Sequence, residues 1–420
     1  KVPMTLTAFV LLILSLALTL NLYFPVLSNA RFMVYSFATG WLAGELALQI
    51  ALIEMLLAAI LLINGSFSGL FGFFAILALF VNWLALLHHH YRGQALGPVV
   101  ESALQKALGA DYRAAINPDL RSALQLAPDF ATQLRPFKRD KTGLTITRNI
   151  PYDHHDLKLD IYAADTRPAS APVLMHIHGG AWMYGDKAGQ AVPLMQHMAR
   201  LGWICCSVAY RLSPSATYPD HIIDCKAALS WIKSNIGDYG GNADFIAVTG
   251  GSAGGHLSAL LALTPNDPAF QPGFETKDTK VQAAVPFYGV FDWSNRDQLQ
   301  HNAGMQSILE DRIVKQTLAA APTLFENASP LLRITDSAPP FMVVHGDKDS
   351  LVPIGLGRVF AAELAAASDN AVVYLEVPGA QHAFDVFASP RSEHTKLGVA
   401  RFLTHAFSQH LAHSGARQTS

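Results

Sequence analysis

The chain has 420 residues, of which 51% are hydrophobic and only 15% are charged, and its formal net charge is −2. The length predicts two or three structural units, and the apolar excess indicates that one of them does not lie in water. The near-zero charge, without a basic cluster, excludes the usual nucleic-acid-binding proteins, which present a basic face to phosphates. Three cysteines cannot all pair, which excludes a disulfide framework, and we expect Cys205, Cys206 and Cys225 to be packing residues.

Residues 1–90 are expected to form a membrane region with three transmembrane helices. Residues 4–27, 32–63 and 67–87 are apolar runs, each long enough to span a bilayer as a helix. A cleaved signal peptide is the alternative for the first run. That run is long, lacks a small-residue cleavage site and precedes two further runs, so we expect a membrane anchor instead.

Three polar side chains interrupt the second apolar run: Glu45, Gln49 and Glu54. Glu45 and Gln49 are four residues apart and therefore share one face of a helix. Carboxylates inside a membrane are costly and often mark a functional site. The alternative, which we favour, is that these side chains lie near an interface or pair with a neighbouring helix.

Basic residues beside the three runs predict the orientation in the membrane. Arg31 lies between the first two runs, and Arg92 and Lys106 follow the third, so all three fall on the side of the C-terminal part. Positive residues favour the cytoplasmic side, and only Lys1 opposes this arrangement. The pattern predicts a multi-pass membrane protein whose C-terminal part lies in the cytoplasm.

Beyond the apolar runs the composition changes twice. Residues 91–143 contain short helical patterns broken by prolines, which predicts a helical collar and a candidate lid. Residues 144–415 alternate apolar strand patterns with helical ones, which is typical of an α/β fold with a mostly parallel sheet and helices on both faces. The predicted strands cover residues 144–150, 157–163, 172–178, 203–210, 245–250, 281–289, 341–346 and 372–379, and predicted helices cover residues 221–236 and 254–264.

The segment TGGSAGGH places one serine among four glycines. Gly250, Ser252 and Gly254 fit the G-x-S-x-G pattern of a nucleophile elbow, and the match falls between a predicted strand and a predicted helix. In such a turn the serine adopts a strained backbone conformation and its hydroxyl projects into a cleft. Ser252 is therefore predicted to be a catalytic nucleophile.

A serine nucleophile needs a base and an acid that orients the base. Where the serine lies on such an elbow, the acid and the histidine follow it in that order along the chain. Asp347 and Asp349 follow one predicted strand, and His382 follows the last. Both loops lie at the carboxyl ends of strands, where open α/β sheets bind their ligands. The order of these residues argues against an ordinary surface histidine and predicts His382 as the base, with either aspartate as the acid.

The tetrahedral intermediate of acyl transfer carries an oxyanion, which backbone N–H groups must stabilise. The string HIHGGAW follows the third predicted strand of the sheet, where the loop for these donors belongs. The predicted oxyanion donors are Gly180, Ala181 and Ala253. His178 and Gly179 are expected to support the loop, and the alternative is that HGG forms only a turn.

Together these strings resemble the α/β-hydrolase superfamily, and within it the carboxylesterases related to hormone-sensitive lipase and the acetyl esterases. The resemblance covers roughly residues 145–412 and rests on HGGAW, YRLSP, YGGNAD, GGSAGGH, HGDKDSLVP and QHAF. It implies that Asp349 rather than Asp347 is the acid. The family often has a third glycine in the oxyanion loop, where this chain has Ala181, which keeps its N–H and narrows the acyl pocket. Membrane-anchored bacterial esterases and prenylcysteine methylesterases also join N-terminal spans to such a domain.

These features predict a membrane-anchored serine carboxylesterase or lipase that hydrolyses apolar esters through an acyl-enzyme. An amidase, formamidase or peptidase is the alternative, because the same triad cleaves both kinds of bond. A non-catalytic membrane scaffold on this fold is a further alternative, but it would have lost triad members. Transport through the predicted spans has little support, because three helices are too few to form a transport path unless the chain forms a homo-oligomer. The sequence contains no metal-ligand or cofactor motif, so the expected partners are a small-molecule or lipid-like ester and the lipid bilayer.

Overall fold

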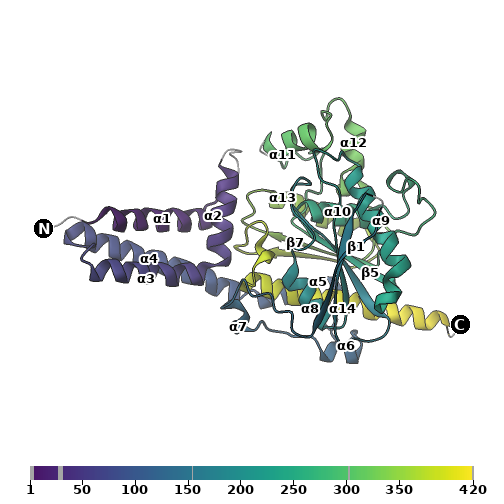
Figure 1. The fold of residues 1–420 in the computed structure, drawn as a ribbon, viewed down its shortest axis with the longest axis horizontal. Coiled ribbons are helices and arrows are strands. Elements are labelled where there is room, and N and C mark those ends of the chain that lie inside the picture. Colours follow the sequence, from purple (N-terminus) through teal and green to yellow (C-terminus); the bar gives the residue numbers. More distant parts are fainter. Residues whose placement is uncertain (1–3, 27–31, 154, 301–302, 419–420) are drawn as a thin grey trace.

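A single β-sheet organises the C-terminal part of the chain in the computed structural model, which describes residues 4–26, 32–153, 155–300 and 303–418 (Figure 1). Within these residues the strand order is β1-β2-β4-β3-β5-β6-β7-β8. The β1–β2 and β2–β4 pairs are antiparallel, and the remaining pairs are parallel. The strands are β1 (Leu144–Pro151), β2 (Lys158–Ala164), β3 (Ala171–Ile177), β4 (Ile204–Val208), β5 (Gly241–Gly251), β6 (Ala283–Phe287), β7 (Phe341–Gly346) and β8 (Val372–Val377). The predicted α/β fold class and all eight predicted strands are confirmed.

Helices cover both faces of the sheet, which explains why its central strands are apolar throughout. Every residue of β3, β4 and β7 is buried. Successive side chains of a strand point to opposite faces, so Leu174 and Met175 of β3 enter different hydrophobic cores. The helices of this part are α5 (Gly97–Leu108), α8 (Val192–Arg200), α9 (Asp220–Asn235), α10 (Ala253–Leu263), α11 (Ala303–Ile308), α12 (Pro322–Asn327), α13 (Ile354–Ala367) and α14 (Pro390–Gln418).

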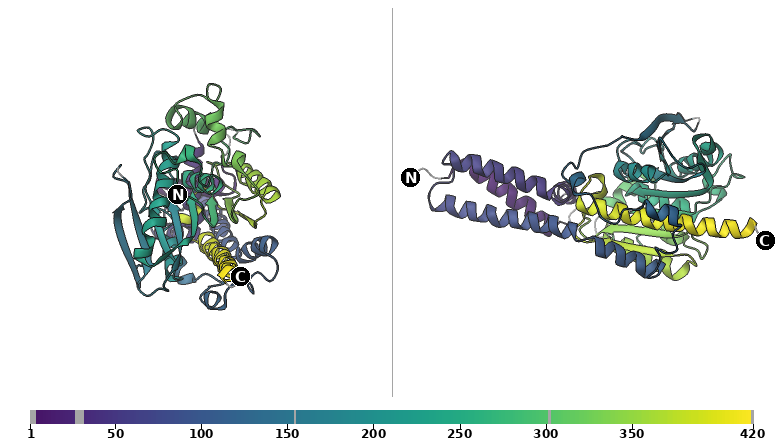
Figure 2. Two further views of the ribbon diagram at one scale, coloured as in Figure 1. Left: turned by 90° about the vertical axis from the view of Figure 1, so that its right-hand side faces the viewer. Right: turned by 90° about the horizontal axis from the view of Figure 1, so that it is seen from below.

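The N-terminal helices form a bundle that projects from one end of the sheet domain (Figures 1 and 2). α1 (Leu6–Tyr23), α3 (Ala47–Ile63) and α4 (Gly69–Gln94) lie side by side in this bundle. α2 (Met33–Glu45) stands across the end of the bundle, between it and the sheet domain. The bundle therefore meets the sheet domain through α2 and the end of α4.

The second predicted span is not one continuous helix. It breaks at Leu46, where α2 and α3 meet at an angle of 86°. Glu45 lies at this break, and its carboxylate accepts a hydrogen bond from Ser389 of the sheet domain. Burying an ionised carboxylate inside a bilayer costs free energy. The Glu45 carboxylate instead lies at the end of the bundle and is hydrogen-bonded there. In the described residues α1 and the stretch Gly69–Leu108 are long and apolar enough to cross a membrane, and the bent pair adds a third crossing if it counts as one span.

Large apolar side chains point outward from the bundle. Leu56 of α3 is 63% exposed and Phe71 of α4 is 82% exposed. Apart from Glu54, the buried positions of α3 are small, with Ala47, Ala51 and Ala58 facing the other helices. Close packing through small residues, with large apolar residues outside, is typical of helices in lipid rather than in water.

The other two polar residues of the second run are also paired. Glu54 accepts a hydrogen bond of 3.0 Å from the Asn82 amide of α4. Gln49 donates a hydrogen bond of 3.0 Å to the carbonyl of Gln133. For Glu45, Gln49 and Glu54 the sequence left open a functional site or pairing with a neighbouring element. The structure contains the pairing.

Residues 97–143 carry α5 and two short helices, α6 (Pro118–Ser122) and α7 (Phe130–Gln133). α5 buries Val100 and Leu104 in the core that β8 and α14 also line. α5 is therefore a layer on the sheet, and the helical collar with a candidate lid over residues 91–143 stays a prediction.

Candidate active site

Ser252 lies on a sharp turn between β5, which ends at Gly251, and α10, which begins at Ala253. Its backbone has φ 57° and ψ −119°, a conformation that residues other than glycine rarely adopt. The turn is held by the Ser252 N–H, which donates to the carbonyl of Phe287 at 3.0 Å. A strained backbone persists only where the surrounding structure maintains it, and such residues cluster at functional sites.

The glycines around Ser252 are required by close backbone contacts. A Cβ at Gly254 would lie 2.0 Å from the carbonyl oxygen of Ile177, and a Cβ at Gly250 would lie 2.5 Å from the same atom. Real Cβ atoms do not approach backbone oxygens so closely, so a side chain at either position would push β3 away from the elbow. The glycine-rich segment thus lets β5, α10 and β3 meet tightly behind the serine.

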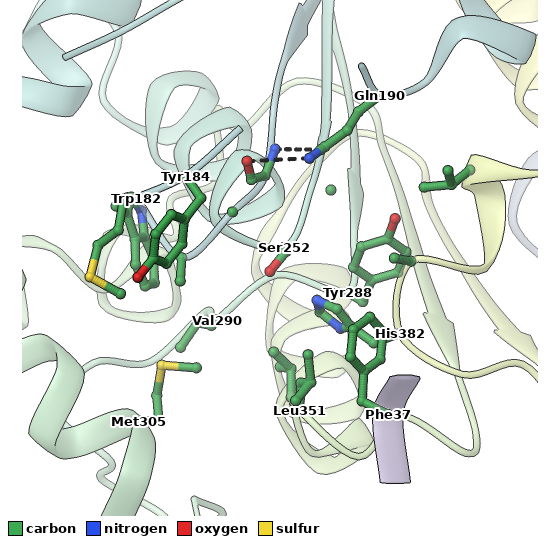
Figure 3. Close-up of a pocket in the computed structure, with 18 of the residues that line it drawn as sticks. Phe37, Trp182, Tyr184, Gln190, Ser252, Tyr288, Val290, Met305, Leu351 and His382 are labelled. Carbon is green, nitrogen blue, oxygen red and sulfur yellow. Dashed lines mark hydrogen bonds between the residues drawn. The ribbon is translucent and has the colours of Figure 1, made fainter. Parts of the chain in front are cut away.

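His382 and Asp349 meet at the carboxyl edge of the sheet. Asp349 follows β7 and His382 follows β8, and the distance from Nδ1 of His382 to Oδ2 of Asp349 is 2.7 Å. His382 lines the same cavity as Ser252. Figure 3 shows Ser252 and the His382 imidazole next to each other at this cavity. Because Nδ1 is engaged by the carboxylate, Nε2 is the ring nitrogen that can accept a proton from the serine.

Asp349 is buried and its carboxylate is surrounded by donors. Its Oδ1 accepts hydrogen bonds from the N–H groups of Leu351 and Val352, at 2.9 and 2.8 Å. Burial alone opposes ionisation, but the imidazoles of His382 and His345 facing Oδ2 hold the pKa of Asp349 well below its usual range. The carboxylate is therefore ionised at neutral pH and favours a proton on Nδ1 of His382.

Asp347 has a different surrounding. Its carboxylate accepts a hydrogen bond of 2.6 Å from the Gly379 N–H. Burial raises the pKa of Asp347 above its ordinary value, and the Gly379 hydrogen bond opposes this effect only in part. The geometry thus brings Asp349 to the imidazole, while Asp347 ties the loop after β7 to the loop after β8.

The loop after β3 borders the cavity next to Ser252. Gly180 and Ala181 have φ of 122° and 51°, and both line the cavity. Ala253 is buried behind Ser252 as the first residue of α10, so its N–H has no acceptor within the helix. Gln190 holds the loop, because its Oε1 accepts a hydrogen bond of 2.7 Å from the Gly179 N–H. Sequence analysis did not identify Gln190, which lies outside the glycine-rich string.

His178 is buried under the same loop. Its Nδ1 lies 2.9 Å from the carbonyl oxygen of Gly179, and its ring stacks on that of Tyr210 with centroids 4.4 Å apart. Burial lowers the pKa of His178, so the ring is neutral at physiological pH. Both contacts join His178 to the protein itself, and its role as a support for the oxyanion loop stays a prediction.

Comparison with known proteins places this geometry in a family. The family model BD-FAE matches residues 159–364. The esterase LipQ of Mycobacterium tuberculosis is 38% identical over 395 residues, which cover 91% of this chain and 87% of LipQ. The chain belongs to the carboxylesterase family of α/β-hydrolases.

Other proteins similar to this esterase are also named as ester hydrolases. The probable carboxylic ester hydrolase LipM of M. tuberculosis is 55% identical over 238 residues, which cover 57% of this chain and 55% of LipM. The chain thus matches about half the length of LipM. A solved carbohydrate esterase from gut microbiota superposes with a TM-score of 0.54 at 23% identity, covering 63% of this chain and 98% of that one, and it supports the fold.

The cavity of the esterase has a volume of about 540 Å³ and a mostly apolar wall. Met183 and Tyr184 line it from the loop after β3, and Met305 and Ile308 line it from α11. Figure 3 shows Val290, Met305 and Leu351 on this apolar wall below Ser252. Mostly apolar cavities with a few polar groups are typical of small-molecule binding sites.

Two residues beside the imidazole of the esterase were not predicted. The Tyr288 ring centroid lies 4.5 Å from that of His382, and the Tyr288 hydroxyl donates to the carboxylate of Asp385. Burial raises the pKa of Asp385 above its ordinary value. No nearby motif distinguishes these two side chains in the sequence, because the fold alone brings the loop after β6 against the loop after β8.

Proposed function

We propose that this carboxylesterase is held in a membrane and cleaves apolar carboxylic esters through an acyl-enzyme on Ser252. The observation that carries the proposal is the 2.7 Å bond between His382 and Asp349, with Ser252 on the same apolar cavity. A strained serine, an imidazole that accepts a proton and a buried carboxylate are the groups that this chemistry needs.

In the first half of the reaction, the Ser252 oxygen bonds to the ester carbonyl carbon while its proton passes to Nε2 of His382. The carbonyl oxygen takes the negative charge, and the N–H groups of Gly180, Ala181 and Ala253 are the proposed donors to it. Collapse of this intermediate breaks the bond to the alcohol oxygen. The alcohol leaves with the proton from His382, and Ser252 keeps the acyl group.

In the second half, a water molecule repeats these steps on the acyl-enzyme. His382 removes a proton from the water, the resulting oxygen attacks the acyl carbon, and the proton returns to Ser252 as the carboxylic acid leaves. Asp349 stays ionised throughout and stabilises the imidazolium that forms in each half.

Labelling of the full chain with a fluorophosphonate tests this proposal. We expect stoichiometric labelling of the wild-type protein and none of the Ser252→Ala variant. A panel of p-nitrophenyl esters beside matched p-nitroanilides then separates the esterase from an amidase, since an amidase cleaves both. Stoichiometric labelling of Ser252→Ala would overturn the assignment of the nucleophile.

We also propose that α1, α3 and α4 cross the membrane and leave the sheet domain on the cytoplasmic side. Arg92 and Lys106 support this orientation by the positive-inside tendency, while Lys1 and Arg31 lie outside the described residues. Tyr91 is 70% exposed at the end of α4, so a Tyr91→Cys variant can report its side of the membrane.

In intact cells an impermeant maleimide should label Tyr91→Cys only after permeabilisation. The unsubstituted chain is the control, because Cys205, Cys206 and Cys225 are all buried. Labelling of the variant without permeabilisation would place the sheet domain on the outer face and reverse the proposed orientation.

A further inference from the structure

α2 has a different position from the other N-terminal helices. It spans 13 residues, so it is about 20 Å long, too short to cross a bilayer. It turns by 86° from α3 and lies across the end of the bundle, against the sheet domain (Figure 1). If the bundle stands upright in a membrane, α2 lies flat near the membrane surface.

One face of α2 forms part of the cavity wall. Met33, Val34 and Phe37 line the same cavity as Ser252, and their spacing places them on one side of the helix. The Phe37 ring meets the His382 ring edge-on, with centroids 5.9 Å apart and planes at 79° (Figure 3). Val34 is 54% exposed, so α2 also forms part of the rim of the cavity.

Contacts with the loop after β8 hold α2 in this position. The Trp41 indole N–H donates a hydrogen bond of 2.9 Å to the carbonyl of Ala383, the residue after His382. The Trp41 ring also stacks on Phe387, with centroids 4.7 Å apart. α2 is therefore fixed to the segment that carries the imidazole.

The loop after β7 is tied into the same contact. Oε1 of Gln381 accepts hydrogen bonds from the N–H groups of Ser350 and His382, at 2.7 and 2.9 Å. Gly40 of α2 packs on this glutamine, since a Cβ at Gly40 would lie 3.3 Å from its Nε2. The Ser350 hydroxyl donates to the carbonyl of Met33 at 3.4 Å. Both loops that carry the His382–Asp349 pair thus rest on α2.

We propose that α2 is a substrate-binding wall and that Phe37 limits the length of the acyl chain that the cavity accepts. This inference rests on the proposed esterase function. The substrate class is an ester with a flexible apolar chain, which passes along α2 between the membrane surface and Ser252. The bundle then supplies part of the site and is more than an anchor.

Chain-length profiles of Phe37 variants test this inference. The full chain in detergent is assayed on p-nitrophenyl esters from acetate to laurate, with rates expressed per serine that a fluorophosphonate labels. For Phe37→Ala we expect the laurate-to-acetate ratio of kcat/KM to rise at least tenfold, about the smallest effect of one methylene in an apolar pocket. Phe37→Trp fills the cavity and should lower the same ratio.

Phe80→Ala is the matched control. Phe80 is 52% exposed on α4, so this variant removes the same ring from the bundle at a position outside the cavity. Its ratio should equal that of the wild type. If Phe37 only packs against the imidazole, Phe37→Ala lowers kcat equally for all esters, and this result overturns the inference.

The labelling step distinguishes the two levels of failure. Absence of labelling in the wild-type protein contradicts the proposed function itself. Normal labelling with an unchanged ratio in both Phe37 variants contradicts only the role of α2. Because rates are counted per labelled serine, partial misfolding of one variant does not hide either result.

Discussion

α3 and α10 are both strongly apolar helices, but they occupy opposite environments. All eleven residues of α10 are buried between β5, β6 and the neighbouring helices. α3 has 17 residues, and its buried positions are three alanines and Glu54. In α10 the large side chains, such as Leu257 and Leu260, enter the core, whereas in α3 they point outward.

The comparison teaches that apolar composition alone does not indicate where a helix lies. A helix that is apolar on all sides is stable either inside a large protein or in lipid. The distribution of large and small residues separates the two cases. α10 brings glycines to the strands and leucines to the core, while α3 brings alanines to its partner helices and leucines to the surroundings.

The largest effect is expected at the start of α10. Ser252→Ala removes the proposed nucleophile, and kcat on a short ester should fall by about 10⁶-fold. The variant should keep its fold, because alanine leaves the elbow backbone unchanged. Circular dichroism and the p-nitrophenyl acetate rate together check this expectation. A normal rate would show that α10 does not present the nucleophile.

The second effect separates the two aspartates after β7. Asp349→Asn should lower kcat by about 10⁴-fold, because the imidazole loses the carboxylate that fixes its tautomer. Asp347→Asn is the matched control and should change kcat by less than about tenfold, since Asp347 bonds to the Gly379 N–H and not to the imidazole. Stopped assays at neutral pH on both variants measure this difference. The reverse order of effects would contradict the geometry.

The third effect tests the difference between the two helices directly. Leu260→Ala in α10 leaves a cavity in the core and should destabilise the sheet domain by about 2–5 kcal/mol. Leu57→Ala in α3 should change stability by at most about 0.5 kcal/mol, because Leu57 is 44% exposed on the outer face. Thermal inactivation in detergent, followed by fluorophosphonate labelling, compares the two variants. Equal losses would show that the outer face of α3 packs on protein.

The smallest effect concerns the contact between α2 and the sheet domain. Trp41→Phe keeps an aromatic ring, though a smaller one, and removes the hydrogen bond to Ala383, which is worth about 1 kcal/mol. The temperature at which half of the protein loses labelling should fall by a few degrees. Tyr35→Phe is the control on the same helix, because Tyr35 is 71% exposed. An unchanged temperature for Trp41→Phe would indicate that α2 contributes nothing to the stability of the site.

Local patterns in the sequence determined the sheet and the elbow. Each strand is a short apolar run bounded by turn residues, and the glycines beside Ser252 reflect contacts within a strand–turn–helix unit. The break at Leu46 had no such signal. Beside this break Glu45 accepts a hydrogen bond from Ser389, which lies 344 residues further along the chain.

The sequence by itself therefore determined the fold class, the position of Ser252 and the apolar character of the first ninety residues. Only the tertiary structure decided that α2 borders the cavity, that α5 covers the sheet instead of the site, and that Gln381 joins the two loops behind the imidazole. The physical reason is the range of the interactions. The apolar runs and turn residues that predict a strand lie within a few residues of one another, but the bond from Trp41 to Ala383 joins residues 342 positions apart and exists only after the chain has folded.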